Sequence, residues 1–165
     1  MRYLLWLCLF CVGCERTPAS KPNSGSTTSA AGGSPERPIR FTKAPRGEPV
    51  EALVQRERGE AQASGQRLLV YVGATWCEPC QRFHQAVEEG RLDGQLPPVR
   101  FLEFDLDEDG DRLKAAGYRS RMIPLFAVPG PDGRGSGRQI EGSIKGEGAV
   151  AEISPRLRRL MEESP

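Results

Sequence analysis

Residues 67–80 read RLLVYVGATWCEPC, and this stretch decides how the rest of the chain is interpreted. Arg67–Gly73 is a nearly continuous apolar run with β-branched and aromatic side chains, which predicts a strand covered on both faces. Two cysteines, Cys77 and Cys80, follow closely, and residues 81–89 have the apolar spacing of a helix. The stretch therefore predicts a buried strand that leads directly to a Cys-x-x-Cys pair at the start of a helix.

The segments on either side of this stretch alternate between strand and helix patterns. Predicted strands are residues 39–42, 99–106, 125–128 and 139–144, and predicted helices are residues 49–63, 109–118 and 148–163. The last helix contains Pro155, which predicts a break or kink at that point. The resulting order, β-α-β-α-β-α-β-β-α, predicts an α/β domain with a central mixed sheet and helices on both faces.

Composition limits the partners of the chain. Its 165 residues include 23 Lys or Arg and 22 Asp or Glu, a formal net charge of +1. Because no strong field of one sign exists, nucleic acid is not an expected partner. The length suits one domain with a short appendage, and no pattern in the sequence signals oligomerisation, so a monomer is expected.

The first residues have the pattern of a secretory signal. Arg2 precedes an apolar run that ends at Val12, and this run is too short for a membrane-spanning helix. Residues 1–13 are therefore interpreted as a signal peptide, with an ordinary cleaved signal or an uncleaved anchor as alternatives. Cys14 follows directly, and the arrangement resembles the lipobox of bacterial lipoproteins, although Cys11 stands where Leu is usual. The resemblance implies that Cys14 carries lipid.

Residues 14–38 are rich in Ser, Thr, Gly, Ala and Pro, which is typical of a flexible tether. Residues 39–165 are interpreted as the folded domain. Together with the lipobox-like Cys14, this organisation predicts a protein of the bacterial cell envelope, held on a membrane through its lipid and facing the periplasm.

The two cysteines of the motif are predicted to carry redox chemistry. Cys77 lies at a helix N-terminus, where backbone N–H groups and the helix dipole stabilise a thiolate. Cys80 lies one turn later and can reach the first sulfur, so Cys77 would attack a substrate disulfide and Cys80 would resolve the mixed disulfide. A zinc site would need two further ligands, and His84 is the one histidine of the chain, so neither a metal nor a cofactor is expected. His84 itself is interpreted as a surface residue.

Three features resemble the thioredoxin superfamily: the motif Trp76-Cys77-Glu78-Pro79-Cys80, the strand before it, and Ile123-Pro124 after it. The resemblance covers residues 39–163 and implies a thioredoxin fold, with a cis peptide bond before Pro124, next to the reactive sulfurs. Trp76 is expected to shield the site and contact substrate. The Cys-Glu-Pro-Cys form is most similar to periplasmic, membrane-tethered branches, which include the C-terminal domain of the disulfide reductase DsbD and the cytochrome c maturation thiol reductases.

The chain departs from thioredoxins at one functional position. Thioredoxins usually carry a buried Asp five residues before the Trp of the motif, where this chain has Tyr71. The lysine that often pairs with that Asp would fall near Glu103. Our hypothesis is that Glu78 or Glu103 replaces the missing acid.

These features together predict a thiol–disulfide oxidoreductase that reduces protein disulfides in the periplasm. Ile123 before Pro124 matches thioredoxins and favours the direction of reduction. Such a reductase needs electrons from a membrane donor of the DsbD type, and its expected clients are apocytochrome c thiols or mispaired secreted proteins. A disulfide oxidase or isomerase, and a thioredoxin-fold metallochaperone or adaptor, remain as alternatives.

Overall fold

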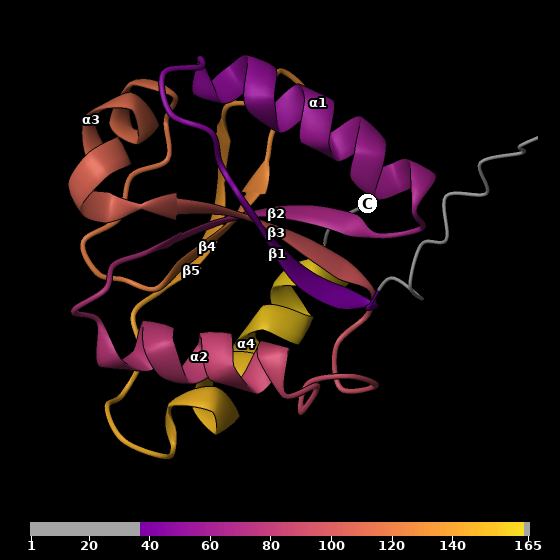
Figure 1. Cartoon of the computed structure of the whole chain (residues 1–165), viewed down its shortest axis with the longest axis vertical. Coiled ribbons are helices and arrows are strands. Elements are labelled where there is room, and N and C mark those ends of the chain that lie inside the picture. Colours follow the sequence, from indigo (N-terminus) through magenta and orange to yellow (C-terminus); the bar gives the residue numbers. More distant parts are fainter. Residues whose placement is uncertain (1–36, 164–165) are drawn as a thin grey trace, which may run out of the picture. The chain divides into compact units, whose positions relative to one another are not determined.

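A five-stranded sheet forms the centre of the computed structural model, which describes residues 37–163 (Figure 1). The strands lie in the order β1-β3-β2-β4-β5. β1, β3 and β2 are parallel to one another, whereas β4 is antiparallel to β2, and β5 to β4. The elements are β1 (Ile39–Lys43), α1 (Val50–Ala63), β2 (Arg67–Gly73), α2 (Glu78–Glu88), β3 (Val99–Asp105), α3 (Leu106–Ala115), β4 (Leu125–Pro129), β5 (Gly135–Glu141) and α4 (Ala149–Glu162). The predicted α/β architecture with a mixed sheet is confirmed.

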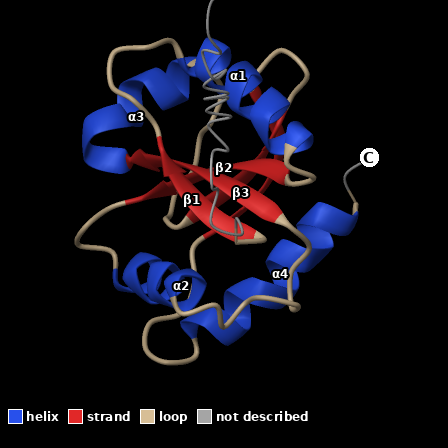
Figure 2. Ribbon diagram, turned by 45° about the vertical axis from the view of Figure 1, so that its right-hand side comes forward, coloured by secondary structure: helices blue, strands red, loops and turns tan. Residues whose placement is uncertain are grey.

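The helices cover both faces of the sheet, with α1 and α3 on one side and α2 and α4 on the other (Figures 1 and 2). β2 lies in the middle of the sheet, and its side chains alternate between the two layers. Leu69 and Tyr71 belong to the core beside α2 and α4, whereas Val70 and Val72 belong to the core beside α1 and α3. Burial on both faces explains why this strand reads as a continuous apolar run.

The predictions for the N-terminal part of the sequence lie outside the described residues. This holds for the signal peptide predicted at residues 1–13, for Cys14 and for nearly all of the predicted tether at residues 14–38. Within residues 37–163, no helix is both long enough and apolar enough to cross a membrane.

Of the break or kink predicted at Pro155, the break does not occur, because α4 runs without interruption through this residue. A proline inside a helix costs about 3 kcal/mol. The buried side chains of Ile153, Leu157 and Met161 pack against the sheet layer from both sides of the proline. Each such side chain contributes roughly 1.5–3 kcal/mol when buried, so packing outweighs the cost of Pro155.

Several element boundaries differ from prediction by three or four residues, and the starts of α3 and β5 have clear physical causes. α3 begins at Leu106 rather than at residue 109, because the Asp105 side chain accepts a hydrogen bond from Asp107 N and caps the helix earlier. β5 begins at Gly135, inside a glycine-rich segment whose sequence predicts a turn. The Gly135 backbone donates to Ala116 O at 2.9 Å, and a Cβ there would lie 2.5 Å from Gly117 O, so a glycine is required for this close approach.

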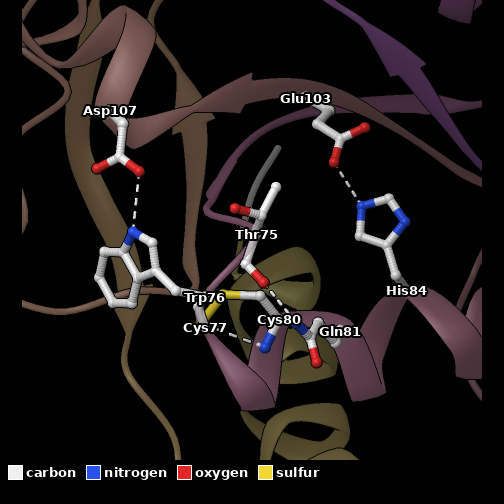
Figure 3. The surroundings of a disulfide bond; sticks show 8 residues. All are labelled: Thr75, Trp76, Cys77, Cys80, Gln81, His84, Glu103 and Asp107. Atoms are coloured by element: carbon white, nitrogen blue, oxygen red, sulfur yellow. Dashed lines mark hydrogen bonds and ion pairs between the residues drawn. A yellow bond between two sulfur atoms is a disulfide. The ribbon is translucent and has the colours of Figure 1, made fainter.

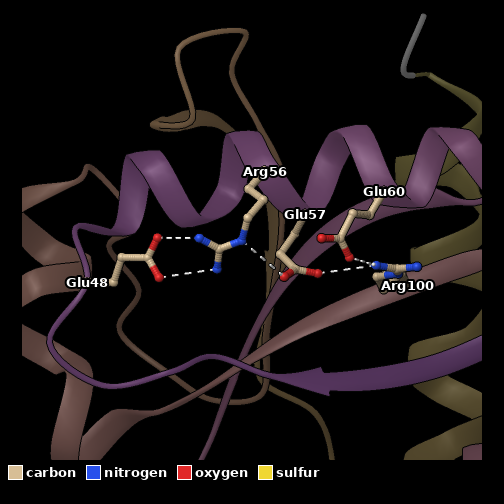
Figure 4. Close-up of polar contacts among 5 residues, drawn as sticks. All are labelled: Glu48, Arg56, Glu57, Glu60 and Arg100. Carbon is tan, nitrogen blue, oxygen red and sulfur yellow. Dashed lines mark hydrogen bonds and ion pairs between the residues drawn. The ribbon is translucent and has the colours of Figure 1, made fainter.

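A buried ion pair joins α1 to β3 (Figure 4). Arg100, which is 4% exposed, donates to Glu57 Oε2 at 3.2 Å and to Glu60 Oε2 at 3.1 Å. Burial, and then the nearby Glu60 charge, raise the pKa of Glu57, and burial lowers the pKa of Arg100. Arg56 of α1 pairs with Glu48, which precedes the helix, and Arg56 Nε also lies 3.9 Å from Glu57 Oε1 (Figure 4). Arg100 is therefore the closer of two cations beside the buried Glu57 carboxylate.

We expect Arg100→Met to destabilise the protein by about 3 kcal/mol, because removal of the closer partner leaves the buried Glu57 carboxylate with only the more distant Arg56 at 3.9 Å. The measurement is urea unfolding at neutral pH. The loss should become smaller at acidic pH, where Glu57 takes up a proton and no longer needs a cation. Glu48→Gln is the matched control, since it breaks the more exposed pair between Arg56 of α1 and a residue that precedes the helix, and it should leave the unfolding midpoint nearly unchanged. Equal losses in the two variants would contradict this account.

Candidate active site

The two cysteines of the motif form a disulfide at the N-terminus of α2 (Figure 3). Cys77 is the N-cap of this helix, and its Sγ accepts a hydrogen bond from Cys80 N at 3.3 Å. The N-cap position exposes sulfur to backbone N–H groups that have no partner within the helix, and to the positive end of the helix dipole. On reduction, the same contacts stabilise the Cys77 thiolate. Pro79 lies in the first turn, where a missing N–H costs nothing.

The two cysteines line different cavities. Cys77 borders a groove of about 390 Å³ that also includes Trp76, Met122 and Ile123. Cys80 borders a cavity of about 570 Å³ on another side of the motif, together with Tyr71 and other residues of the sheet. The two sulfurs therefore have different surroundings, although they are bonded to each other.

The groove beside Cys77 carries exposed apolar side chains. Trp76, the first residue of the motif, is 64% exposed, and Met122 of the same groove is 58% exposed. The Trp76 indole is held in place, because its Nε1 donates to Asp107 Oδ2 at 2.8 Å (Figure 3). The Ile123–Pro124 peptide bond, which also belongs to this region, is cis. The groove thus offers an apolar contact surface directly beside one sulfur.

Glu78, one of the two acids suggested as proton carriers, is held at the surface. Its side chain is 40% exposed, accepts from Arg82 Nε at 3.0 Å, and accepts from Gly146 N at 3.2 Å. The hydrogen bond from Arg82, followed by that from Gly146, lowers the pKa of Glu78. It borders the groove of Cys77 and not the cavity of Cys80. This geometry favours a role in holding the loop at Gly146 against α2.

Glu103, the other suggested acid, lies in the cavity beside Cys80 and contacts His84. His84 Nε2 and Glu103 Oε1 are 2.5 Å apart (Figure 3). The imidazole also stacks on the Phe41 ring, with the ring centroids 3.7 Å apart. The His84 side chain is 27% exposed, so His84 is a partly buried residue with two side-chain partners and not a free surface histidine. Its spacing, four residues after Cys80 on the same helix face, was the signal in the sequence that could have identified it.

Tyr71 stands where thioredoxins usually carry the buried acid. It is fully buried, and burial together with the Glu103 charge raises the pKa of its hydroxyl far above the ordinary value. Tyr71 therefore stays neutral and cannot take the place of a carboxylate. The described residues contain no group of three His, Cys, Asp or Glu side chains able to hold a metal ion.

Comparison with known proteins agrees with this geometry. A sequence family described as thioredoxin-like matches residues 50–131, which run from the start of α1 through the motif to the end of β4. The chain belongs to the thioredoxin superfamily. The predicted thioredoxin fold and family are thereby confirmed. Family membership and the Cys77–Cys80 disulfide together support thiol–disulfide oxidoreductase activity.

Several solved thioredoxins are similar to this chain. Thioredoxin from Trichomonas vaginalis is 22% identical, with 77% of this chain and 98% of that chain covered and a TM-score of 0.47. Oxidised thioredoxin O1 from Arabidopsis thaliana is 21% identical, with 76% and 96% covered and a TM-score of 0.43. A mutant thioredoxin from Halobacterium salinarum is 19% identical, with 77% and 94% covered and a TM-score of 0.43. A search of curated proteins found no match.

We expect Glu78→Gln to leave the pKa of the Cys77 thiol nearly unchanged, because an exposed carboxylate already paired with Arg82 exerts little field on the sulfur. The pKa is measured from the pH dependence of Cys77 alkylation in the reduced chain. The chain for this test carries Cys8→Ser, Cys11→Ser and Cys14→Ser, so that Cys77 and Cys80 are its two thiols. A shift of about one pKa unit or more would show that Glu78 acts on the thiol after all.

Proposed function

We propose that this protein reduces disulfide bonds of other proteins in the periplasm, with Cys77 as the nucleophile and Cys80 as the resolving thiol. The observation that carries the proposal is the disulfide at the N-terminus of α2, with one cysteine bordering an exposed apolar groove. A structural disulfide would not need a sulfur at a helix N-cap, where a thiolate is stabilised. The described residues also offer no further metal ligands that would make the pair part of a metal site.

The proposed reaction proceeds in two thiol–disulfide exchanges. The Cys77 thiolate attacks one sulfur of the client disulfide, that S–S bond breaks, and the other client sulfur leaves and takes up a proton from water. The Cys80 thiol then loses its proton, and its thiolate attacks Cys77 Sγ and forms the Cys77–Cys80 disulfide. The second client sulfur is released as a thiolate and is protonated. Two electrons have passed from the dithiol to the client.

The groove beside Cys77 supports a protein client. Trp76 and Met122 place two large exposed apolar side chains on the same groove, and exposed apolar side chains that gather in one place mark sites of protein contact. The backbone next to the cis Ile123–Pro124 bond lies at the same groove, where an extended client segment can pass close to Cys77. Trp76 and Pro124 are therefore assigned to client binding in this proposal.

The direction of electron flow is proposed from Ile123, which precedes Pro124 as it does in thioredoxins. Continued reduction needs an external dithiol that returns two electrons to the Cys77–Cys80 disulfide, and a membrane protein of the DsbD type is the proposed donor. A lipid on Cys14 and a tether at residues 14–38 would keep the domain within reach of such a donor. Apocytochrome c thiols and mispaired secreted proteins are the proposed clients.

The reduction potential of the Cys77–Cys80 pair tests the direction. Equilibration of the full chain carrying Cys8→Ser, Cys11→Ser and Cys14→Ser against glutathione should give a value near or below about −230 mV, as in reducing members of the superfamily. A value between about −120 and −180 mV would instead identify an oxidant or isomerase. Such a value would replace the membrane donor by an oxidising partner in the proposal.

The replacement Cys77→Ser separates an enzyme from an adaptor. In an enzyme, this change should abolish reduction of a protein disulfide such as those of insulin, because no nucleophile remains to form the mixed disulfide. Pull-down of bound client from the same preparation is the second measurement. Retained binding of a full set of partners, with biological activity unaffected in a complementation assay, would favour the adaptor. Cys80→Ser is the matched control, since it should trap mixed disulfides rather than prevent them.

A further inference from the structure

Three polar side chains meet beside Cys80 without a role in the reaction described so far. Tyr71 and Glu103 are partners in the parallel pairing of β2 with β3, so their side chains lie next to each other on the same face of the sheet. This face is the one covered by α2, which carries Cys80 and, one turn later, His84. All four residues border the same cavity of about 570 Å³. The cavity thus connects the resolving thiol with a histidine–carboxylate pair.

Two buried oxygens in this group have unused hydrogen-bonding capacity. Within residues 37–163, the Tyr71 hydroxyl and Glu103 Oε2 are buried and have no hydrogen-bond partner. Buried polar atoms are almost always satisfied by protein or by water. A cavity of this size, with at least two polar atoms that need partners, meets the requirements for internal water. Because Cys80, Tyr71 and Glu103 all border this cavity, water inside it would lie between the resolving cysteine and the carboxylate.

The other charged groups around the cavity either have partners elsewhere or are exposed to solvent. They are Lys43 of β1, Arg46 of the following loop, Glu88 of α2, Asp105 of β3, and Glu108 and Asp109 of α3. Asp109 accepts from Asp105 N and Arg112, and Glu108 pairs with Arg46. Lys43 and Glu88 are exposed, and Lys43 lies opposite Glu103 in the pairing of β1 with β3. Among the acids that border the cavity, Glu103 is thus the one whose side chain contacts the histidine His84.

The pairing with His84 gives Glu103 a neighbour with which it can share a proton, because a histidine ring nitrogen can either donate or accept one. The stacking of the imidazole on Phe41 and its contact with Glu103 Oε1 keep the ring in one position. A proton that arrives at Glu103 Oε2 can therefore be shared with His84 instead of remaining on an isolated carboxyl.

We propose that the His84–Glu103 pair accepts the proton of the Cys80 thiol, through water in the shared cavity, when Cys80 resolves the mixed disulfide. The inference rests on the proposed function, since it concerns the second exchange of that reaction. The S–H bond of Cys80 breaks, its proton passes through water to Glu103 Oε2, and the sulfur keeps the electron pair with which it attacks Cys77 Sγ. Tyr71 holds the water through its hydroxyl. The proton returns to solvent before the next cycle.

Single-turnover kinetics separate the two exchanges. The reduced full chain carrying Cys8→Ser, Cys11→Ser and Cys14→Ser is mixed with an aromatic disulfide whose thiolate is coloured. The first phase of colour reports attack by Cys77, and the second phase reports resolution by Cys80. Both phases are recorded across pH for Glu103→Gln, His84→Gln and Tyr71→Phe. Glu88→Gln is the matched control, since it neutralises another carboxylate on the border of the same cavity.

Near neutral pH, Glu103→Gln should slow the second phase by on the order of 10²-fold, as expected for loss of a proton acceptor, and leave the first phase unchanged. His84→Gln should slow the same phase, Tyr71→Phe should slow it less, and Glu88→Gln should slow neither phase. At alkaline pH the second phase should recover in the slowed variants, because hydroxide then removes the Cys80 proton. A merely structural role would not produce this recovery.

An unchanged second phase in both Glu103→Gln and His84→Gln would overturn the inference, and so would a loss that persists at alkaline pH. If Glu103→Gln does not fold, the pH dependence of the second phase is measured in the chain that retains both His84 and Glu103. A second phase that rises about tenfold per pH unit from about pH 5 to pH 9 would make hydroxide the acceptor and would exclude His84–Glu103. Failure of the proposed function gives a different result, since the unsubstituted chain would then release no second thiolate.

Discussion

The site depends on a single contact, the hydrogen bond of 3.3 Å from Cys80 N to Cys77 Sγ. This contact exists because β2 ends at Gly73 and α2 begins at Glu78, which makes Cys77 the N-cap. At this position a helix leaves its N–H groups without internal partners, so a sulfur placed there becomes their acceptor. A helix that began one residue earlier would enclose Cys77 in its first turn and remove its sulfur from these donors.

The sheet distributes the two thiols between two environments. Cys77, at the end of the helix, borders the exposed groove with Trp76, whereas Cys80, within the first turn, borders the cavity above the sheet. Because β2 and β3 pair in parallel register, Tyr71 and Glu103 stand side by side on the floor of that cavity. In the proposed reaction, the groove contacts the client and the cavity receives the proton of Cys80. The proposed roles of Cys77 and Cys80 are therefore separated by one turn of α2.

Much of the fold could be predicted from local patterns, and the errors have physical causes. The bounds of β2 match the prediction because burial on both faces leaves an unbroken apolar run. The start of β5 was missed because Gly135 carries no side chain that would signal a strand, and its place is set by the close approach to Gly117. The continuity of α4 was missed because local preference opposes Pro155 there, while burial of Ile153 and Leu157 decides otherwise.

The sequence by itself determined the identity of the redox pair, since Cys77 and Cys80 meet through a local turn of helix whose spacing is visible in the chain. It also pointed to Glu103 through the missing acid at Tyr71, but it could not choose between Glu103 and Glu78. Only the tertiary structure decided that His84 and Glu103 form a pair. They are 19 residues apart on different elements, and their contact depends on how α2 packs over β3 and how Phe41 supports the imidazole.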